Sequence, residues 1–258
     1  MIQIVLIVIT ENPMPLSDIT VAISSFCRWG YLVECLKQIK EHLPECPVIV
    51  ADDSFDDRCA TIAGPSCIRL APDSGLTVKR CRIVEATTTP YMLLFCDDFA
   101  ANTKGYRDKL TEAVDLLDTH SEIDLVGGRV DNNPYEANLV HDAEKNVIRE
   151  IRLVPDGSPY QRCDLVVNHF IARVSVLLEV PWDTDVVKIG GEHGQFFWHR
   201  KKADKVTVWL PGWNINTLSL GYGPEVQDPR YNGFRRRAFT MGHTIMLRKE
   251  GIKDWIGA

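Results

Sequence analysis

Tyr91-Met-Leu-Leu-Phe-Cys-Asp-Asp-Phe99, written YMLLFCDDF, is the stretch that decides the fold of this chain. Its first five residues are apolar or aromatic, and two adjacent carboxylates, Asp97 and Asp98, follow after Cys96. The pattern predicts a buried strand, and ligands of open α/β sheets bind at the carboxyl ends of such strands. Paired carboxylates there repel each other and lose solvation, so a cation should compensate them. A divalent metal on a nucleotide diphosphate would do so; a solvated acidic turn is the alternative.

Strand and helix patterns alternate on both sides of this stretch. In the first 100 residues we expect strands at 19–24, 48–51, 67–70 and 91–95, and helices at 31–42 and 77–86. This alternation is typical of an α/β fold with a mostly parallel, Rossmann-like central sheet and helices on both faces. The apolar residues 1–9 also have the pattern of a strand.

The rest of the chain has a looser pattern. We expect helices at 104–119, 192–203 and 238–250, strands at 124–130, 165–172 and 206–210, and a hairpin with loops within 132–159. Residues 214–231 form a long segment rich in Gly and Pro, which is a candidate lid around Gly221-Tyr222-Gly223. We see no repeat or long linker, so we predict one domain over residues 1–258.

Composition favours a soluble, cytoplasmic protein. The 258 residues are 45% hydrophobic and 25% charged, which is ordinary for a globular domain. No run approaches the roughly 20 apolar residues of a membrane span, and no basic leader with a cleavage site is present. The eight cysteines show no CxxC pair, which favours free thiols in a reducing compartment while leaving one or two disulfides open.

The net charge of −6 is unevenly distributed. From Asp228 onward, three acidic residues stand against seven basic ones, namely Arg230, Arg235, Arg236, Arg237, Arg248, Lys249 and Lys253. Such a segment can meet a polyanion, although a solvated helix face is the more common outcome.

Three further clusters can carry chemistry. Asp52-Asp53 follows a predicted strand and can accept hydrogen bonds from ribose or base, or simply cap a turn. Lys79 and Arg80 lie early in the helix before Tyr91 and can offset a diphosphate; for Lys79 we favour a solvated helix face. In Gly190-Gly191-Glu192-His193, the glycines let the backbone approach a ligand, and the acid at a helix start is either a cap or a base.

These residues also carry a family resemblance. The segments that carry it are ITVAISSFCRWGYLVECLKQIKEHLPECPVIVADDS, GLTVKRCRIVEATTTPYMLLFCDDF, DLVGG, CDLVVNHFIAR and WDTDVVKIGGEHGQFFWHRKKA. In order and spacing, over residues 19–218, they resemble the motifs of β-1,4-N-acetylgalactosaminyltransferase-like, family-2-type glycosyltransferases. The resemblance implies a GT-A fold, with residues 19–100 as the nucleotide-binding half, 101–218 as the acceptor and catalytic half, and 219–258 as a basic loop and helix.

The resemblance implies roles for residues around a donor nucleotide. Phe26 and Arg28 match positions that contact the uracil nucleotide. Asp52 and Asp53 match the carboxylates that hold uridine. Arg80 matches an arginine of the nucleotide-sugar site.

It also implies the catalytic groups. Asp97 and Asp98 match the last two acids of the family's Asp-Asp-Asp motif, with Asp98 as the main ligand of Mn²⁺ or Mg²⁺. Glu192 matches the acid near the acceptor, where inverting enzymes place their base. Asp164 and Asn168 match polar positions that frame the donor sugar. The expected activity is therefore inverting transfer from a UDP-sugar to the hydroxyl of a glycan or other acceptor.

The sequence departs from the family at three points. Cys96 replaces the first acid of the triple, Cys81 replaces an asparagine, and residues 212–217 lack the family's late histidine. His193 or His243 could complete a metal shell, although a lone histidine is more often structural. Trp182, Phe196, Phe197, Trp198 and Trp213 could stack on sugars, although core packing is the commoner use of such residues.

Two other functions stay open. The acceptor could be modified DNA, bound through the segment Arg235-Arg236-Arg237 and revealed by steep salt dependence. Alternatively, the chain could be an inactive nucleotide-sugar or glycan-binding module, as the departures from the family motif suggest. A nucleotidyltransferase fits less well, because its Gly-rich phosphate loop is absent.

Overall fold

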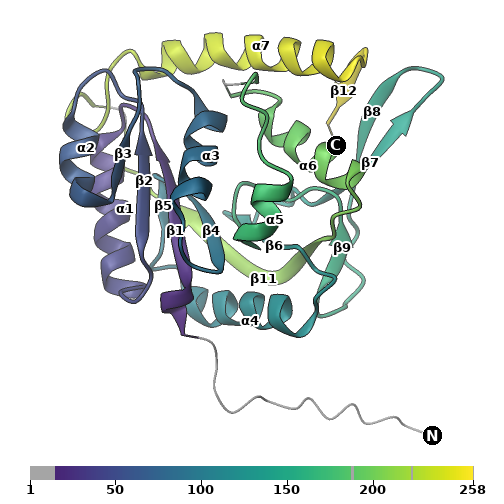
Figure 1. Ribbon diagram of the computed structural model, residues 1–258, viewed down its shortest axis with the longest axis horizontal. Coiled ribbons are helices and arrows are strands. Elements are labelled where there is room, and N and C mark those ends of the chain that lie inside the picture. The colour runs from purple at the N-terminus through teal and green to yellow at the C-terminus, as the bar shows by residue number, and fades with distance from the viewer. Residues whose placement is uncertain (1–14, 187–188, 222, 258) are drawn as a thin grey trace, which may run out of the picture.

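The computed structural model describes residues 15–186, 189–221 and 223–257. The strand expected at residues 1–9 and the position of Tyr222 lie outside these ranges. Within them, the fold is a large curled α/β sheet covered by helices on both faces (Figure 1).

The central sheet confirms the α/β expectation. Its strands are β1 (Ile19–Ser25), β2 (Val48–Asp52), β3 (Cys67–Arg69), β4 (Tyr91–Cys96), β5 (Phe99–Ala100), β6 (Leu125–Val130), β9 (Gln161–Cys163), β10 (Phe170–Arg173) and β11 (Thr207–Thr217). They run in the order β3-β2-β1-β4-β10-β6-β11-β5, with β9 beside β11. The first four strands and the pair β6–β11 are parallel, whereas β10 is antiparallel to both its neighbours. The parallel half is therefore the half that places several carboxyl ends at one edge.

Successive side chains of the strands point to opposite faces of the sheet, and a hydrophobic core lies on each face. On one face lie α1 (Trp29–His42), α2 (Arg58–Ala63) and α4 (Tyr106–Thr119), and on the other α3 (Leu76–Ala86), α5 (Val174–Glu179) and α6 (Glu192–Lys202). In β4, Leu93 and Phe95 enter the first core and Met92 and Leu94 the second. A strand buried on both faces needs an uninterrupted apolar run, which is the pattern that Tyr91 begins.

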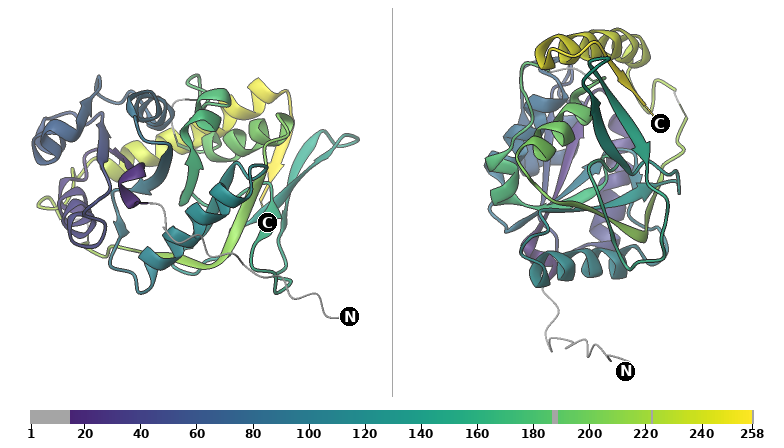
Figure 2. Two further views of the ribbon diagram at one scale, coloured as in Figure 1. Left: turned by 60° about the horizontal axis from the view of Figure 1, so that its bottom comes forward. Right: turned by 90° about the vertical axis from the view of Figure 1, so that its right-hand side faces the viewer.

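A smaller sheet stands beside the central one. It consists of β7 (Ala137–Asp142), β8 (Val147–Arg152) and the late strand β12 (Asp254–Ile256), which pairs parallel to β8. Figure 2 shows this sheet below the end of α7 (Tyr231–Glu250), a 20-residue helix that crosses the carboxyl ends of the parallel strands. Short 3₁₀ turns occupy Leu16–Asp18 and Gly64–Ser66.

Several predicted boundaries need correction. The strand expected over 165–172 is regular only from Phe170, because residues 165–169 turn toward the ligand side and make a single bridge through Leu165. The supposed loop at 214–231 begins as the end of β11, and the last helix begins at Tyr231 rather than Ala238. Gly221, Gly223, Pro224 and Pro229 interrupt the pattern of this region, so the sequence does not reveal the ends of the two elements.

The cysteines and the helix lengths complete the description of the fold. All eight cysteines are free thiols. No helix in the described part of the chain is long and apolar enough to cross a bilayer.

Candidate active site

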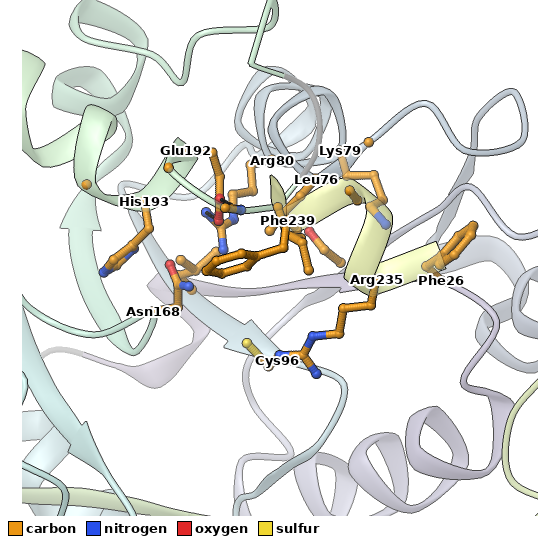
Figure 3. Close-up of a pocket in the computed structure, with 18 of the residues that line it drawn as sticks. Phe26, Leu76, Lys79, Arg80, Cys96, Asn168, Glu192, His193, Arg235 and Phe239 are labelled. Carbon is orange, nitrogen blue, oxygen red and sulfur yellow. Dashed lines mark hydrogen bonds and ion pairs between the residues drawn. The ribbon is translucent and has the colours of Figure 1, made fainter. Parts of the chain in front are cut away.

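A cavity of about 560 Å³ opens at the carboxyl ends of β1, β2 and β4. Its size is within the usual range of ligand pockets. The wall is formed by the ends of these strands, the start of α3, the turn before α6 and one side of α7. Figure 3 shows Phe26 and Lys79 toward one end and His193 toward the other, with Glu192 and Arg80 pointing at each other between them.

One end of the cavity is built around Asp53. The residue is 1% exposed, and its carboxylate accepts bonds from Lys79 Nζ at 2.5 Å and from the backbone N of Gly75 at 2.7 Å. Gly75 has φ +103°, a conformation that a side chain would disfavour, and it begins α3. Lys79 also donates to the carbonyl of Ser25 at 2.9 Å. The pair therefore ties β1, β2 and α3 together.

An aromatic group closes this end. The ring of Phe26 lies 5.5 Å from that of Phe55, 6.1 Å from Phe234 and 6.3 Å from Tyr231. Cys27, next to Phe26, has φ +57°, which turns the chain sharply after β1. This turn brings both Phe26 and Arg28 to the cavity wall. A flat, apolar surface beside Asp53 suits a nucleobase.

Arg28 holds the carboxylates that end β4. It donates to Asp97 Oδ1 at 2.7 Å and to Asp98 Oδ2 at 3.0 Å. Burial would lower the pKa of Arg28, but the two carboxylates outweigh it and raise that pKa above its ordinary value. Burial raises the pKa of Asp97 to about 7, although Arg28 opposes the shift. The cation expected beside the acidic pair is thus supplied in part by the protein itself.

The centre of the cavity joins an acid to a buried guanidinium. Glu192 is 6% exposed and accepts a bond from the backbone N of Gly190 at 2.7 Å. Arg80 Nη1 lies 3.9 Å from Glu192 Oε1, too far for a hydrogen bond. Arg80 is 3% exposed, its Nε and Nη1 have no hydrogen-bond partner, and burial lowers its pKa. Asn168 Oδ1 is also unpartnered on the same wall.

Unpartnered buried polar atoms cost free energy unless a ligand or water satisfies them. A guanidinium and an amide oxygen, both lining a cavity, therefore indicate a ligand with acceptor and donor groups. Arg28, Lys79 and Arg235 also line the wall, together with the carboxylates of Asp53, Asp97 and Asp98.

Solved structures share this architecture. The crystal structure of GalNAc-T7 with UDP, GalNAc and Mn²⁺ matches 93% of this chain and 48% of its own, with a TM-score of 0.63 and 11% identity. The GT-A fold of glycosyltransferases is the fold of this chain. The mannosyltransferase PcManGT from Pyrobaculum calidifontis, solved with GDP-Man and Mn²⁺, matches 90% of this chain and 64% of its own, with a TM-score of 0.58 and 15% identity.

Sequence relatives agree with the resemblance drawn from the motifs. β-1,4 N-acetylgalactosaminyltransferase 2 of Mus musculus is 30% identical over 187 residues, and β-1,4 N-acetylgalactosaminyltransferase 1 of Homo sapiens is 28% identical over 202 residues. Each match covers 69% of this chain but 35% of the relative, so the chain spans about a third of the length of these relatives. No protein-family model matches the chain.

The GT-A fold brings most of the predicted site residues to one cavity. Those that line it are Phe26, Arg28, Asp53, Arg80, Asp97, Asp98, Asn168 and Glu192. Their assignment as ligand contacts stays a prediction. Two others are not on the wall.

Asp52 and Asp164 are the two predicted site residues that do not line this cavity. Asp52 is fully buried behind the cavity, where it accepts bonds from Arg69 and from the hydroxyl of Ser54. Asp164 accepts bonds from Lys201 Nζ at 2.6 Å and from the backbone N of Leu139 at 2.8 Å. In this conformation both carboxylates bind groups of the protein, and their assignment as ligand contacts stays a prediction.

Other cavity residues were missed by sequence reasoning. Lys79 is not on a solvated helix face: it is 4% exposed and paired with Asp53. Lys79 and Asp53 are far apart in the chain, so the sequence does not predict that they form an ion pair. Sequence reasoning named Arg235 and His243 as candidate contacts but did not place the inner side of α7 at the cavity. This side contributes Tyr231, Phe234, Arg235, Ala238, Phe239, His243 and Met246.

The segment expected to be a lid packs elsewhere. The described residues of 218–230 lie against the start of α1, where Tyr31 Oη donates to the carbonyl of Gly221 and Gly30 N to that of Val226. The roof of the cavity is α7 instead. Among the candidate stacking aromatics, Trp182, Phe196, Phe197 and Trp213 are buried in the cores, and Trp198 also lies off the cavity wall.

The acidic pair fits a metal that is shared with a substrate. In the described ranges no cluster of three or more His, Cys, Asp or Glu side chains is arranged to hold an ion. Burial raises the pKa of the Cys96 thiol, which disfavours a thiolate beside the acidic pair. Mg²⁺ is commonly held by one or two carboxylates together with substrate phosphates, and Asp98 with Asp97 can supply the carboxylates.

Proposed function

We propose that this chain is a glycosyltransferase that moves a sugar from a UDP-sugar to an acceptor hydroxyl with inversion at the anomeric carbon. The observation that carries this proposal is the unpartnered guanidinium of Arg80 beside Glu192, in a cavity whose other end holds Asp53 and an aromatic group. The named activities of the sequence relatives and the ligands of the fold neighbours support it.

The nucleotide would lie between Asp53 and Phe26. Asp53 can accept a hydrogen bond from the base or ribose on one side of its carboxylate while Lys79 Nζ holds the other side in place. The rings of Phe26 and Phe234 provide apolar contact for the base. The diphosphate then falls near Arg28, Arg80 and Arg235, whose charges match it.

A divalent ion, Mn²⁺ or Mg²⁺, held by Asp98 and Asp97 would stabilise the charge on the leaving diphosphate. Arg28 occupies one oxygen of each carboxylate, so it fixes their orientation while leaving the second oxygen of each to a ligand. Arg80 and Arg235 would add hydrogen bonds to the phosphate oxygens as the charge develops.

Glu192 would act as the general base. Its carboxylate would take the proton of the acceptor hydroxyl while that oxygen forms a bond to the anomeric carbon. The bond from this carbon to the diphosphate oxygen breaks on the opposite face, and its electron pair leaves with UDP. The bond from Gly190 N and the nearby charge of Arg80 hold the carboxylate in place before the proton moves.

Donor binding tests the first half of this proposal. UDP-sugars with Mn²⁺ should raise the melting temperature of the protein, because a ligand that binds only the folded state stabilises it. The shift should shrink without the ion and in Asp98→Asn. No shift with any UDP-sugar, with or without Mn²⁺, would contradict the proposal.

Glu192→Gln tests the base. Transfer should fall by about 10²–10⁴-fold, the usual contribution of general base catalysis, while the UDP-induced thermal shift remains. Glu179→Gln is the matched control, because Glu179 is an exposed acid paired with Lys205 away from the cavity. An unchanged transfer rate in Glu192→Gln would remove this residue from the mechanism.

A further inference from the structure

The cavity continues past Glu192 to a second end that the proposed donor does not occupy. Its walls come from Tyr135, Glu150, His193 and Trp255. Trp255 lies on β12 and Glu150 on β8, so the small sheet beside the central one reaches the cavity here. Pairing of β12 with β8 aligns Trp255 with Ile148 and places a residue from the far end of the sequence in the site.

The aromatic side chains at this end are held in fixed positions. Trp255 Nε1 donates to Glu150 Oε1 at 2.7 Å. The edge of its indole lies against α6, because a Cβ placed on Gly194 would meet Trp255 Cζ2 at 2.8 Å. On the other wall, the ring of Tyr135 lies 5.6 Å from that of His193. Rigid aromatic surfaces of this kind bind ligands with a small loss of conformational entropy.

His193 carries an unpartnered hydrogen-bond acceptor at this end of the cavity. Its Nε2 lies 2.6 Å from the carbonyl of Val166, and a carbonyl only accepts, so Nε2 carries the proton. Nδ1 is then an acceptor; it is buried and has no partner. A hydroxyl group is a donor that would satisfy it.

The two ends also differ in charge. Arg28, Lys79 and Arg235 line the end that we assign to the diphosphate, together with Asp53, Asp97 and Asp98, whereas Glu150 and the aromatic rings line the far end. A phosphate at the far end would meet Glu150 and none of these three basic side chains. A neutral ligand with hydroxyl groups and an apolar face matches the far end instead.

We propose that Tyr135, Glu150, His193 and Trp255 form the acceptor subsite, which takes a neutral pyranose ring stacked on Trp255, with hydroxyls bonded to Glu150 and His193 Nδ1. This assignment rests on the proposed glycosyltransferase function and adds the class of its acceptor. The hydroxyl that attacks would point toward Glu192, which precedes His193 in α6.

Tryptophan fluorescence with UDP-loaded protein tests the subsite directly. We would titrate wild-type protein, Trp255→Phe and Trp198→Phe with neutral methyl pyranosides of galactose, glucose, N-acetylglucosamine and N-acetylgalactosamine. At least one sugar should change the emission of wild type and Trp198→Phe in a saturable way, but not that of Trp255→Phe. Trp198 is a matched control because it packs on the same core as Trp255 but is off the cavity wall.

Gly194→Ala keeps Trp255 as the fluorescent reporter, so it distinguishes a loss of sugar binding from a loss of the reporter. Alanine favours the helix, but its Cβ would displace the indole of Trp255. The Kd of the responding sugar should rise at least about fivefold, which corresponds to about 1 kcal/mol. The thermal shift by UDP with Mn²⁺ should stay unchanged.

Two results would overturn the subsite: no pyranoside changes the emission, or Trp255→Phe responds as wild type does. A response to a short DNA duplex in place of the sugars would also overturn it. If UDP produces no thermal shift in wild type, the proposed function fails; if UDP binds normally and the sugars do not, the subsite alone fails.

Discussion

Arg28 and Asp97 form the shortest bridge between β1 and the acids that end β4: the guanidinium Nη1 lies 2.7 Å from Asp97 Oδ1. The same guanidinium reaches Asp98 at 3.0 Å. The sequence indicates that the two carboxylates need a cation. The fold supplies the guanidinium of Arg28, which lies in a turn 69 residues before Asp97. A metal ion that binds Asp97 and Asp98 would therefore meet carboxylates whose charge Arg28 already partly neutralises.

Arg28→Met tests whether Arg28 and a metal ion compete for the carboxylates of Asp97 and Asp98. Removing one partner of a buried pair usually costs about 3–5 kcal/mol of stability, and the partial exposure of Asp98 places the expected loss toward the lower value. Mn²⁺ alone should then raise the melting temperature of the variant more than that of wild type, because the carboxylates have lost their cation. Arg107→Met, which breaks an exposed pair with Glu45, should change neither quantity appreciably. Equal Mn²⁺ shifts in Arg28→Met and wild type would show that Arg28 does not screen the pair.

Lys79→Ala should be more damaging than a surface lysine would suggest. It leaves the Asp53 carboxylate buried without its cation, and such a loss costs about 3–5 kcal/mol. Urea denaturation measures the cost, and the UDP-induced thermal shift should fall as Asp53 loses its orientation. Arg82→Ala, on the same helix but in an exposed pair with Glu85, is the control. If the two variants unfold at the same urea concentration, the Lys79–Asp53 pair does not support the fold.

Gly242→Ala tests how α7 is held over the cavity. A Cβ on Gly242 would lie 2.5 Å from the carbonyl oxygens of Gly190 and Ile189, so the helix must move away from the turn that precedes Glu192. Overpacking of this kind costs about 1–3 kcal/mol, and the rate of transfer should fall with it.

Gly233→Ala is the control on the same helix. A Cβ there meets nothing nearer than Arg237 Nη1 at 4.0 Å. It should stabilise the protein by roughly 0.5–1 kcal/mol, as Ala does relative to Gly within a helix. Urea midpoints and transfer rates of the two variants check both expectations; equal behaviour would show that α7 does not pack on this turn in solution.

His169 should make stability depend on pH. It is fully buried, and burial lowers its pKa to about 3, below the ordinary value of about 6.5. Since the folded pKa is depressed, its contribution is complete above about pH 6.5 and is lost as pH falls toward 3. The free energy of unfolding should fall by up to about 1.4 kcal/mol per pH unit for each such histidine. Urea midpoints at several pH values should show a shallower slope for His169→Phe; His193, whose pKa is also lowered to about 3, keeps the slope above zero. Identical slopes would refute the assignment.

The local pattern of apolar and polar residues was sufficient to predict most helices and strands and the order of the site motifs. Residues 48–51 and 91–95 have apolar runs that only a strand buried on both faces needs, and both became central strands of the sheet. The strand expected over 165–172 was wrong in its first half, because the residues that approach Asn168 follow the shape of the cavity rather than a ladder. Strand β12 and helix α5 carry too few residues for periodicity to reveal them.

Motif matching did not predict which carboxylates form ion pairs within the protein. Asp52 and Asp53 are adjacent and chemically identical, yet the alternation of a strand sends them to different partners, Arg69 and Lys79. Asp164 is occupied by Lys201, which lies 37 residues later in the chain. No spacing in the sequence encodes these pairings.

The sequence by itself determined where carboxylates and glycines follow strands, because side-chain periodicity and covalent neighbours are local properties. Tertiary structure alone decided which charges meet: Arg28 with Asp97, Lys79 with Asp53, and Arg80 with Glu192. It also decided that α7 covers the cavity and that Trp255 reaches its far end. These contacts join segments far apart in the chain, and the packing of two cores fixes them.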